Sequence, residues 1–186
     1  MKNITFNEYV RMIEKWKNNN DFREINIQNE VVKPFIEALG DEFDVIDVSI
    51  KGRESKNHDY LAYCGTYESG GKKKATTPDL IITKNWNWRN RENKVKYYCS
   101  VEVKSPFLNE RLYDKEKYSD FLKAKINRHL SAKENHKLIL TDGIKWEFYE
   151  KQKEKKSFNL YVKDTEWQWN PLDFEDIKKS IKDFLK

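Results

Sequence analysis

The sequence predicts an α/β domain in which a mixed β-sheet is flanked by helices. Along the chain, the hydrophobic pattern changes from two helical segments to three strands, then to a helix, further strands and a last helix. The length of 186 residues suits a single domain. Charged residues make up 36% of the chain, yet 10 Phe, 10 Tyr and 6 Trp can still build a core, which argues against disorder.

Two helices are expected first. The stretch Thr5-Phe6-Asn7-Glu8 has the spacing of a capping box, and apolar residues then recur at helical intervals, so residues 5–18 are predicted to be helical. A second helix is predicted from about residue 26 to residue 39, where it stops before Gly40. Pro34 must lie near the first turn of this helix or bend it.

Three strands and a third helix are expected next. Residues 43–50 alternate apolar and acidic side chains as a strand does, and a polar loop with glycines is predicted over 52–77. Residues 80–83 and 97–103 are short apolar runs that we expect to form neighbouring strands. The next helix is predicted over 114–131, with one apolar face made of Tyr118, Phe121, Leu122, Ile126 and Leu130.

The C-terminal part is predicted to add a hairpin, a strand and a helix. Residues 137–140 and 144–149 are apolar runs separated by Asp142-Gly143, a typical hairpin turn. A charged tip then leads to a strand over 158–162. Asp173 has the position of an N-cap, so a final helix is expected after it.

Charge and cysteine content narrow the class of protein. The formal net charge of +5 and the pI near 8.9 favour a polyanionic partner. There is no run of about 18 apolar residues and no secretory signal pattern, so we expect a cytoplasmic protein without a membrane partner. Cys64 and Cys99 cannot make a zinc site between them, and a reducing compartment would keep both as thiols.

Other common binding motifs are missing. Gly65 and Gly71 bracket five residues, one more than a P-loop allows. Lys72 is followed by Lys73 where a Ser or Thr should bind magnesium, so no ATP site is predicted. The histidines are scattered without paired metal spacing, and His129 is expected at an interface or on the surface.

Three polar residues are expected to converge at one end of the apolar sheet. Pro78-Asp79 opens one predicted strand, and Glu102-Val103-Lys104 closes the neighbouring one. Residues two apart on a strand share a face and lie roughly 6 to 7 Å apart, so Glu102 and Lys104 point together while Val103 faces the core. Two carboxylates from adjacent strands suit Mg²⁺, and a lysine beside them can polarise a water or neutralise a phosphate.

These residues resemble the motif of the PD-(D/E)XK nuclease superfamily. The segment from Asn29 to Gly40 is similar to the helix that carries the family's upstream glutamate, and Leu140 to Tyr149 is similar to the hairpin after the last core strand. The likeness is closest to the nuclease domain at the N-terminus of type I restriction enzyme motor subunits and their small standalone relatives. It implies a restriction-endonuclease-like core over about 24–149, with the helix at 5–18 and the elements at 158–186 as additions.

The resemblance also implies roles for individual residues. Asp79 and Glu102 would bind a metal ion together with the main-chain carbonyl of Val103. Lys104 would position or activate the nucleophilic water. Glu30 would reach the metal directly or through water. The implied cofactor is Mg²⁺, with Mn²⁺ as a substitute.

Each role has a plainer alternative. Glu30 could be a surface carboxylate on its helix, with Glu37 as another candidate two turns away, and Asp79 could simply start a turn after a proline. An acid-x-Lys pattern also occurs elsewhere in this charged chain, although only the one at Glu102 lies inside an apolar strand. Many members of these subfamilies carry Gln-x-x-x-Tyr on the helix after the lysine, and here that helix has no glutamine.

Two basic stretches are candidates for nucleic-acid contact. Lys72, Lys73 and Lys74 precede Asp79 on the loop that we expect to enter the site, and they are predicted to contact phosphates. In residues 84–96, basic and aromatic side chains are interleaved and could clamp a phosphate backbone; equally, this segment could be a hairpin whose tryptophans cover its own sheet. The candidates in that segment are Trp86, Trp88, Arg89 and Arg91.

Together these observations predict a Mg²⁺-dependent DNA endonuclease that hydrolyses phosphodiester bonds by in-line attack of a metal-bound water. The resemblance suggests a prokaryotic restriction, defence, phage or mobile-element setting. Since no motor or sequence-reading module is recognisable, we expect either a homodimer or a nuclease part of a larger system. The alternatives are a catalytically inactive nucleic-acid-binding or assembly module with the same fold, and cleavage of RNA rather than DNA.

Overall fold

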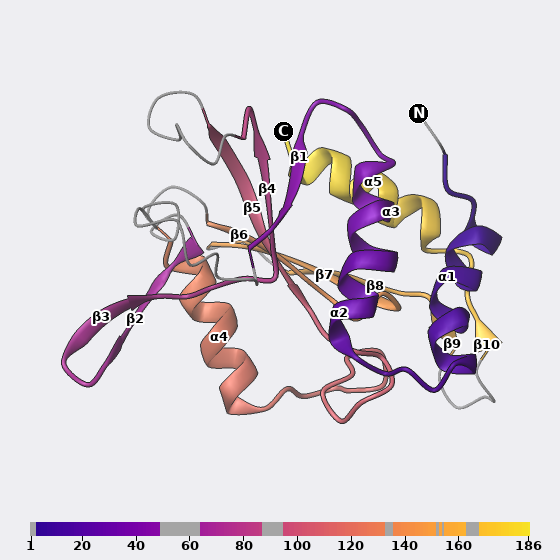
Figure 1. The fold of residues 1–186 in the computed structure, drawn as a ribbon, viewed down its shortest axis with the longest axis horizontal. Coiled ribbons are helices and arrows are strands. Elements are labelled where there is room, and N and C mark those ends of the chain that lie inside the picture. The colour runs from indigo at the N-terminus through magenta and orange to yellow at the C-terminus, as the bar shows by residue number, and fades with distance from the viewer. Residues whose placement is uncertain are drawn as a thin grey trace.

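A six-stranded β-sheet with helices on both faces forms the centre of the protein (Figure 1). The computed structural model describes residues 3–48, 64–86, 95–132, 136–151, 153, 155–162 and 168–186. The strand order is β1-β4-β5-β6-β7-β8, in which β5 and β6 are parallel and the other neighbours are antiparallel. This mixed sheet confirms the predicted α/β class. The strands are β1 Asp44–Asp47, β4 Leu80–Lys84, β5 Lys96–Val103, β6 Lys137–Thr141, β7 Lys145–Glu150 and β8 Lys156–Asn159.

The N-terminal helices follow the sequence pattern with one shift. Helix α1 spans Phe6–Asn18, and both hydrogen bonds of the predicted capping box between Thr5 and Glu8 are present. The second helix begins two residues earlier than predicted, as α2 Glu24–Ile27, and continues through a π-helical turn, η1 Gln28–Val32, into α3 Lys33–Glu37. Pro34 has no N–H to donate within the helix, and the wider π turn directly precedes it.

The two faces of the sheet bury different cores. Side chains alternate along a strand, so Val101 and Val103 of β5 join a large cluster beneath α1, α2, α3 and α5 (Phe174–Phe184). Leu138 and Leu140 of β6 lie on the other face and pack against helix α4, Asp120–Leu130. Figure 1 shows α4 on one side of the sheet and the remaining helices on the opposite side. Glu102 therefore faces α4.

Helix α4 is shorter than predicted. It begins at Asp120 rather than near residue 114, because the Ser119 hydroxyl accepts a hydrogen bond from the main-chain N–H of Leu122 and caps the helix there. The prediction that Phe121 lies on the apolar face is wrong, since its side chain is 66% exposed. The buried face of α4 instead consists of Leu122, Ile126 and His129.

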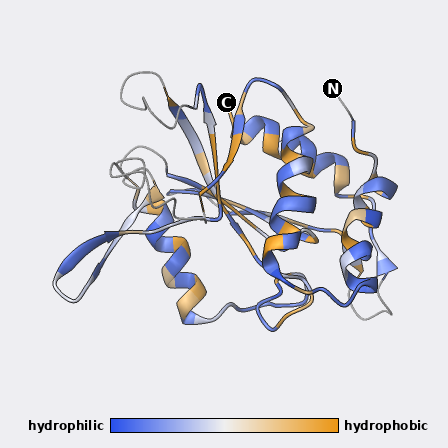
Figure 2. Ribbon diagram, viewed as in Figure 1, coloured by the Kyte–Doolittle hydropathy of each residue, from blue (hydrophilic) through white to orange (hydrophobic). Residues whose placement is uncertain are grey.

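The loop predicted over 52–77 is wrong for its second half. Thr66–Ser69 (β2) and Lys72–Ala75 (β3) form a separate two-stranded antiparallel ribbon, while residues 52–63 lie outside the described part. Gly70 and Gly71 connect the strands with φ angles of 60° and 69°, which is the tight type I′ turn that suits a hairpin. The ribbon extends away from the body of the protein (Figure 1), and β3 is strongly hydrophilic (Figure 2).

The predicted hairpin at Asp142-Gly143 is confirmed, and it depends on a buried carboxylate. Asp142 Oδ1 accepts hydrogen bonds from the N–H groups of Ile144 and Lys145, and Oδ2 accepts from those of Leu112 and Tyr113. These four bonds fasten the segment before α4 to the turn. Burial raises the pKa of Asp142, against the effect of the main-chain donors.

The C-terminal strand and helix differ slightly from the prediction. The strand expected over 158–162 is divided at Leu160 into β8 and β9, Tyr161–Val162, and β9 pairs with β10, Gln168–Trp169. Asp173 precedes α5 as predicted, but its carboxylate accepts from the N–H of Asn159 instead of capping the helix. Neither cysteine forms a disulfide. Among the described residues, no helix is both long and apolar enough to cross a membrane.

Asp142→Ala should strongly destabilise the protein. The substitution leaves four main-chain donors, two in buried and two in part-buried hydrogen bonds, without their acceptor, at a cost on the order of 3–5 kcal/mol in the free energy of unfolding. Urea denaturation followed by circular dichroism measures the change. Asp183→Ala is the control, since Asp183 makes only an exposed ion pair with Lys186. Equal and small shifts of the two midpoints would show that the Asp142 bonds do not matter.

Candidate active site

Asp79, Glu102 and Lys104 meet at one corner of the sheet. The residue before β4, Asp79, lies beside the end of β5, where its N–H donates to the carbonyl of Val101 at 3.1 Å. Its Oδ2 in turn accepts from the N–H of Val103 at 2.7 Å. The antiparallel pairing of two buried apolar strands thus brings together the acids that the sequence predicts as neighbours.

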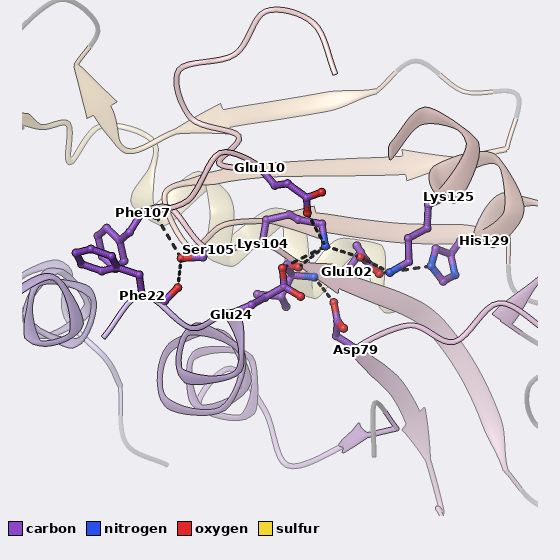
Figure 3. A network of polar contacts seen from close by, with 11 residues as sticks. Phe22, Glu24, Asp79, Glu102, Lys104, Ser105, Phe107, Glu110, Lys125 and His129 are labelled. Carbon is purple, nitrogen blue, oxygen red and sulfur yellow. Dashed lines mark hydrogen bonds and ion pairs between the residues drawn. The ribbon is translucent and has the colours of Figure 1, made fainter. Parts of the chain in front are cut away.

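Lys104 makes the central contacts of this corner (Figure 3). Its Nζ lies 2.8 Å from Glu102 Oε1 and 3.2 Å from Glu24 Oε2, and it donates to the Val103 carbonyl at 3.0 Å. Burial lowers the pKa of Lys104, but the negative charges of Glu102 and Glu24 outweigh burial and hold the pKa above its usual range. Lys104 is therefore an ammonium group at neutral pH.

Helix α4 supplies two more partners for Glu102. Lys125 Nζ lies 2.5 Å from Glu102 Oε1, and His129 Nε2 lies 3.6 Å from Oε2. Because the two side chains are four residues apart, both project from the same face of the helix. His129 Nδ1 is 2.9 Å from the carbonyl of Cys64 and must carry a proton there, since a carbonyl oxygen only accepts. The expected surface or interface position of His129 is therefore wrong: its side chain is buried.

The pKa values of the two acids at this corner are shifted in opposite directions. Burial raises the pKa of Glu102, but His129, Lys104 and Lys125 outweigh burial and hold this pKa at about 2. For Asp79, burial and the nearby Glu102 charge raise the pKa to about 7, although the hydrogen bond from Val103 opposes them. Negative charge at Asp79 is thus poorly compensated by the protein, which is the environment in which an added cation gains most.

The helix glutamate that lies at this corner is Glu24, and the structure does not bring Glu30 there. Glu30 lies in the π-helical turn with an exposed side chain, where it lines a separate groove with Trp16 and Pro34. Glu24 is the first residue of α2 and binds Lys104. The helix start predicted near residue 26 leaves Glu24 outside the helix, whereas the structure places Glu24 in its first turn.

The donor atoms at this corner fit a hard divalent cation. Within the described residues, no three His, Cys, Asp or Glu side chains are grouped so that they could hold a metal ion. Mg²⁺ nevertheless commonly binds through only one or two carboxylates and keeps several waters. Asp79, Glu102 and the Val103 carbonyl offer oxygen ligands of this kind. Among the described residues, Glu102 Oε2 accepts no hydrogen bond, and it faces the buried His129 Nε2 at 3.6 Å.

The basic candidates lie elsewhere. Lys72, Lys73 and Lys74 are exposed on strand β3 of the ribbon, not on a loop entering the site. The Trp86 ring packs edge-on against Tyr97, with ring centroids 6.3 Å apart, in a small cluster on the sheet. This packing agrees with a tryptophan that covers its own sheet. Trp88, Arg89 and Arg91 lie outside the described residues.

Three residues of the corner have no role in the sequence prediction: Glu24, Lys125 and His129. For Lys125 and His129 the sequence offers one indication: they are four residues apart on the helix that follows Lys104, so they share a face of that helix. Comparison with protein-family models, curated proteins and solved structures found no match for this chain.

Asp79→Asn and Glu102→Gln should change stability in opposite directions in metal-free buffer. The folded-state pKa of Asp79, about 7, lies above its ordinary value of 3.8, so ionisation of Asp79 weakens the folded state as pH rises from about 4 to 7. Asp79→Asn removes this cost and should stabilise the protein at pH 8, by on the order of 1–3 kcal/mol, with little effect near pH 4. Glu102→Gln removes the buried negative charge that pairs with both Lys104 and Lys125 and should cost about 3–5 kcal/mol.

Urea denaturation in the presence of chelator, at several pH values, checks both substitutions. Destabilisation by Asp79→Asn at pH 8 would contradict the assigned electrostatics of Asp79. A neutral effect of Glu102→Gln would show that its ion pairs are not needed for folding.

Proposed function

We propose that the protein is a metal-dependent DNA endonuclease with a restriction-endonuclease-like fold, acting in a prokaryotic restriction, defence, phage or mobile-element setting. The observation that supports this most is the convergence of Asp79, Glu102 and Lys104 at one corner of the sheet. The fold proposal is supported by antiparallel β1, β4 and β5 followed by a crossover through α4 to the parallel strand β6. This is the kind of mixed, helix-flanked sheet that the sequence resemblance implies.

Asp79 and Glu102, with the main-chain carbonyl of Val103, would hold the cation. When bound there, Mg²⁺ supplies positive charge that screens the anionic phosphate and stabilises the departing oxygen. Asp79 suits this role because its own surroundings compensate its charge poorly. Glu102 is ionised and would contribute Oε2, which faces His129 Nε2 at 3.6 Å and makes no hydrogen bond to the described residues.

Lys104 would act as a fixed ammonium group and not as a proton acceptor. Glu102 and Glu24 keep its pKa high, so it can orient the attacking water and neutralise charge on the phosphate. In the proposed reaction, the water oxygen forms a bond to phosphorus and the opposite phosphorus–oxygen ester bond breaks. The water loses a proton, the departing oxygen gains one, and the products are a phosphate monoester and a free hydroxyl.

One observation favours a second function, a nucleic-acid-binding or assembly module without catalysis. Lysine ammonium groups already contact the Val103 carbonyl and Glu102 Oε1, so one proposed ligand atom and the second oxygen of the Glu102 carboxylate are paired within the protein. Catalysis requires these lysines to turn toward a phosphate when a cation binds. A module that only binds nucleic acid has no such requirement.

Asp79→Ala and Lys104→Ala should each reduce Mg²⁺-dependent DNA cleavage by at least about 100-fold, because they remove a proposed cation ligand and the fixed positive charge. Plasmid, linear and single-stranded DNA and RNA, with Mg²⁺, Mn²⁺ or chelator, serve as substrates, and gel analysis follows the products. Lys123→Ala, an exposed change on α4, is the control. Metal-dependent cutting that survives both substitutions would remove the assigned site. Binding without cutting by the native protein would favour the second function.

Glu24→Gln should lower cleavage about tenfold, whereas Glu30→Gln should leave it unchanged. Glu24 holds the Lys104 ammonium group at 3.2 Å, and loss of a charge-assisted hydrogen bond of this kind costs roughly 1.5 kcal/mol. Glu30 is exposed in a separate groove. Initial cleavage rates of the two variants, measured side by side, decide the point. The reverse order of effects would restore Glu30 as the upstream acid.

A further inference from the structure

The β2–β3 ribbon projects from the body of the protein (Figure 1), and its root contacts the candidate active site. Cys64, immediately before the ribbon, presents its carbonyl to His129, which faces Glu102. The two root segments are joined by the hydrogen bond from the Thr76 N–H to the Gly65 carbonyl at 2.9 Å. Four residues in each strand give a reach of about 13 Å beyond this root. A ligand held by the ribbon would therefore extend toward the corner of Glu102.

Helix α4 fixes the direction of the ribbon. The guanidinium of Arg128 lies over the Tyr67 ring, 4.5 Å from its centroid. Gly65 has a φ of 95°, and a Cβ atom there would lie only 1.7 Å from the Arg128 carbonyl oxygen, so the backbone of the root is pressed against the helix. The same helix carries Lys125 and His129 to Glu102. Helix α4 thus contacts both the ribbon and the candidate active site.

The charge of the ribbon is distributed over both faces. Directly opposed residues of an antiparallel pair share a face, so Lys74 beside Tyr67 and Lys72 beside Ser69 lie on one face. Lys73, opposite Glu68, lies on the other. All three lysines are exposed. Lysines lie on both faces, and the face of Lys72 and Lys74 carries the larger positive charge, because Glu68 offsets Lys73 on the other face. A ribbon placed between two rows of phosphates can use lysines on both faces, whereas a ribbon lying flat on one strand would use a single face.

From these observations we propose that the β2–β3 ribbon inserts into the major groove of double-stranded B-form DNA and guides the duplex toward the Glu102 corner. The major groove of B-form DNA is about 12 Å wide and admits a two-stranded ribbon. The deep, narrow major groove of an RNA duplex does not. Tyr67 is the ribbon's one aromatic side chain, and Arg128 occupies one face of its ring, so that face is not open for stacking an unpaired base. This inference rests on the proposed nuclease function and specifies its substrate.

Binding without cleavage tests the ribbon independently of the chemistry. Fluorescence anisotropy in chelator compares the native chain with Lys72→Ala/Lys73→Ala/Lys74→Ala on a DNA duplex of about two helical turns, its single strand and the matching RNA duplex. The triple variant should lose at least about tenfold in affinity for the DNA duplex, and the slope of log affinity against log salt should become less steep by about 2 to 3. Affinity for the single strand and the RNA duplex should change much less.

A matched control has the same charge change elsewhere. Lys179→Ala/Lys182→Ala/Lys186→Ala alters three exposed lysines of α5 and its C-terminal end and should leave DNA-duplex affinity within about twofold of the native protein. Thermal unfolding of both triple variants checks that they fold. The proposal is overturned if the native chain does not bind the DNA duplex or binds the other probes as tightly. An equal loss in the control variant also overturns it.

Cleavage of the same duplex with Mg²⁺ separates the two proposals. Ribbon-dependent duplex binding without any cleavage would overturn the nuclease function while the ribbon assignment stands. Cleavage that is unaffected by the lysine substitutions, together with unchanged binding, would overturn the ribbon assignment and leave the nuclease function in place.

Discussion

The buried charge of Glu102 is the constraint on which this corner of the protein depends. A carboxylate with 1% of its surface exposed must be compensated, because an unpaired buried charge costs several kcal/mol. Lys104, directly after β5, and Lys125 of α4 supply that compensation, and His129 faces the remaining oxygen. Through Lys104 the pairing reaches Glu24 on α2, and through His129 it reaches the root of the β2–β3 ribbon. One carboxylate therefore connects the sheet, two helices and the ribbon.

The surroundings of Glu102 stabilise its negative charge, whereas those of Asp79 disfavour a negative charge. The pKa of Glu102 is held at about 2, whereas that of Asp79 is raised to about 7. The two acids come from neighbouring strands, so the difference arises from the side chains that face them and not from the sheet itself. A protein selected only for stability would replace Asp79 with a neutral residue. Asp79 is a poorly compensated acid that lies beside a paired acid and a lysine. This pattern is expected where binding or chemistry sets the sequence.

Sequence patterns predict the sheet better than they predict the surroundings of the site. The strands holding Asp79 and Glu102 are short apolar runs, and their pairing follows from burial alone. The helix start at Glu24 was not predictable in the same way, because Arg23 makes no side-chain cap and the π turn before Pro34 alters the helical period. His129 is buried only because a distant segment, at Cys64, supplies a carbonyl acceptor. The ribbon is not predictable from the sequence, because its two strands are polar and lack the alternation of apolar residues that indicates a strand with one buried face.

The central claim is that Asp79, Glu102 and the Val103 carbonyl hold a divalent cation beside Lys104. Anomalous diffraction from crystals soaked in Mn²⁺ tests it most directly, because manganese scatters anomalously and prefers the same oxygen ligands as magnesium. The account predicts a peak at this corner, with oxygens of both carboxylates at about 2.1 to 2.2 Å and Lys125 withdrawn from Glu102. Fully occupied manganese elsewhere, with this corner empty and both lysines still paired to Glu102, would contradict it.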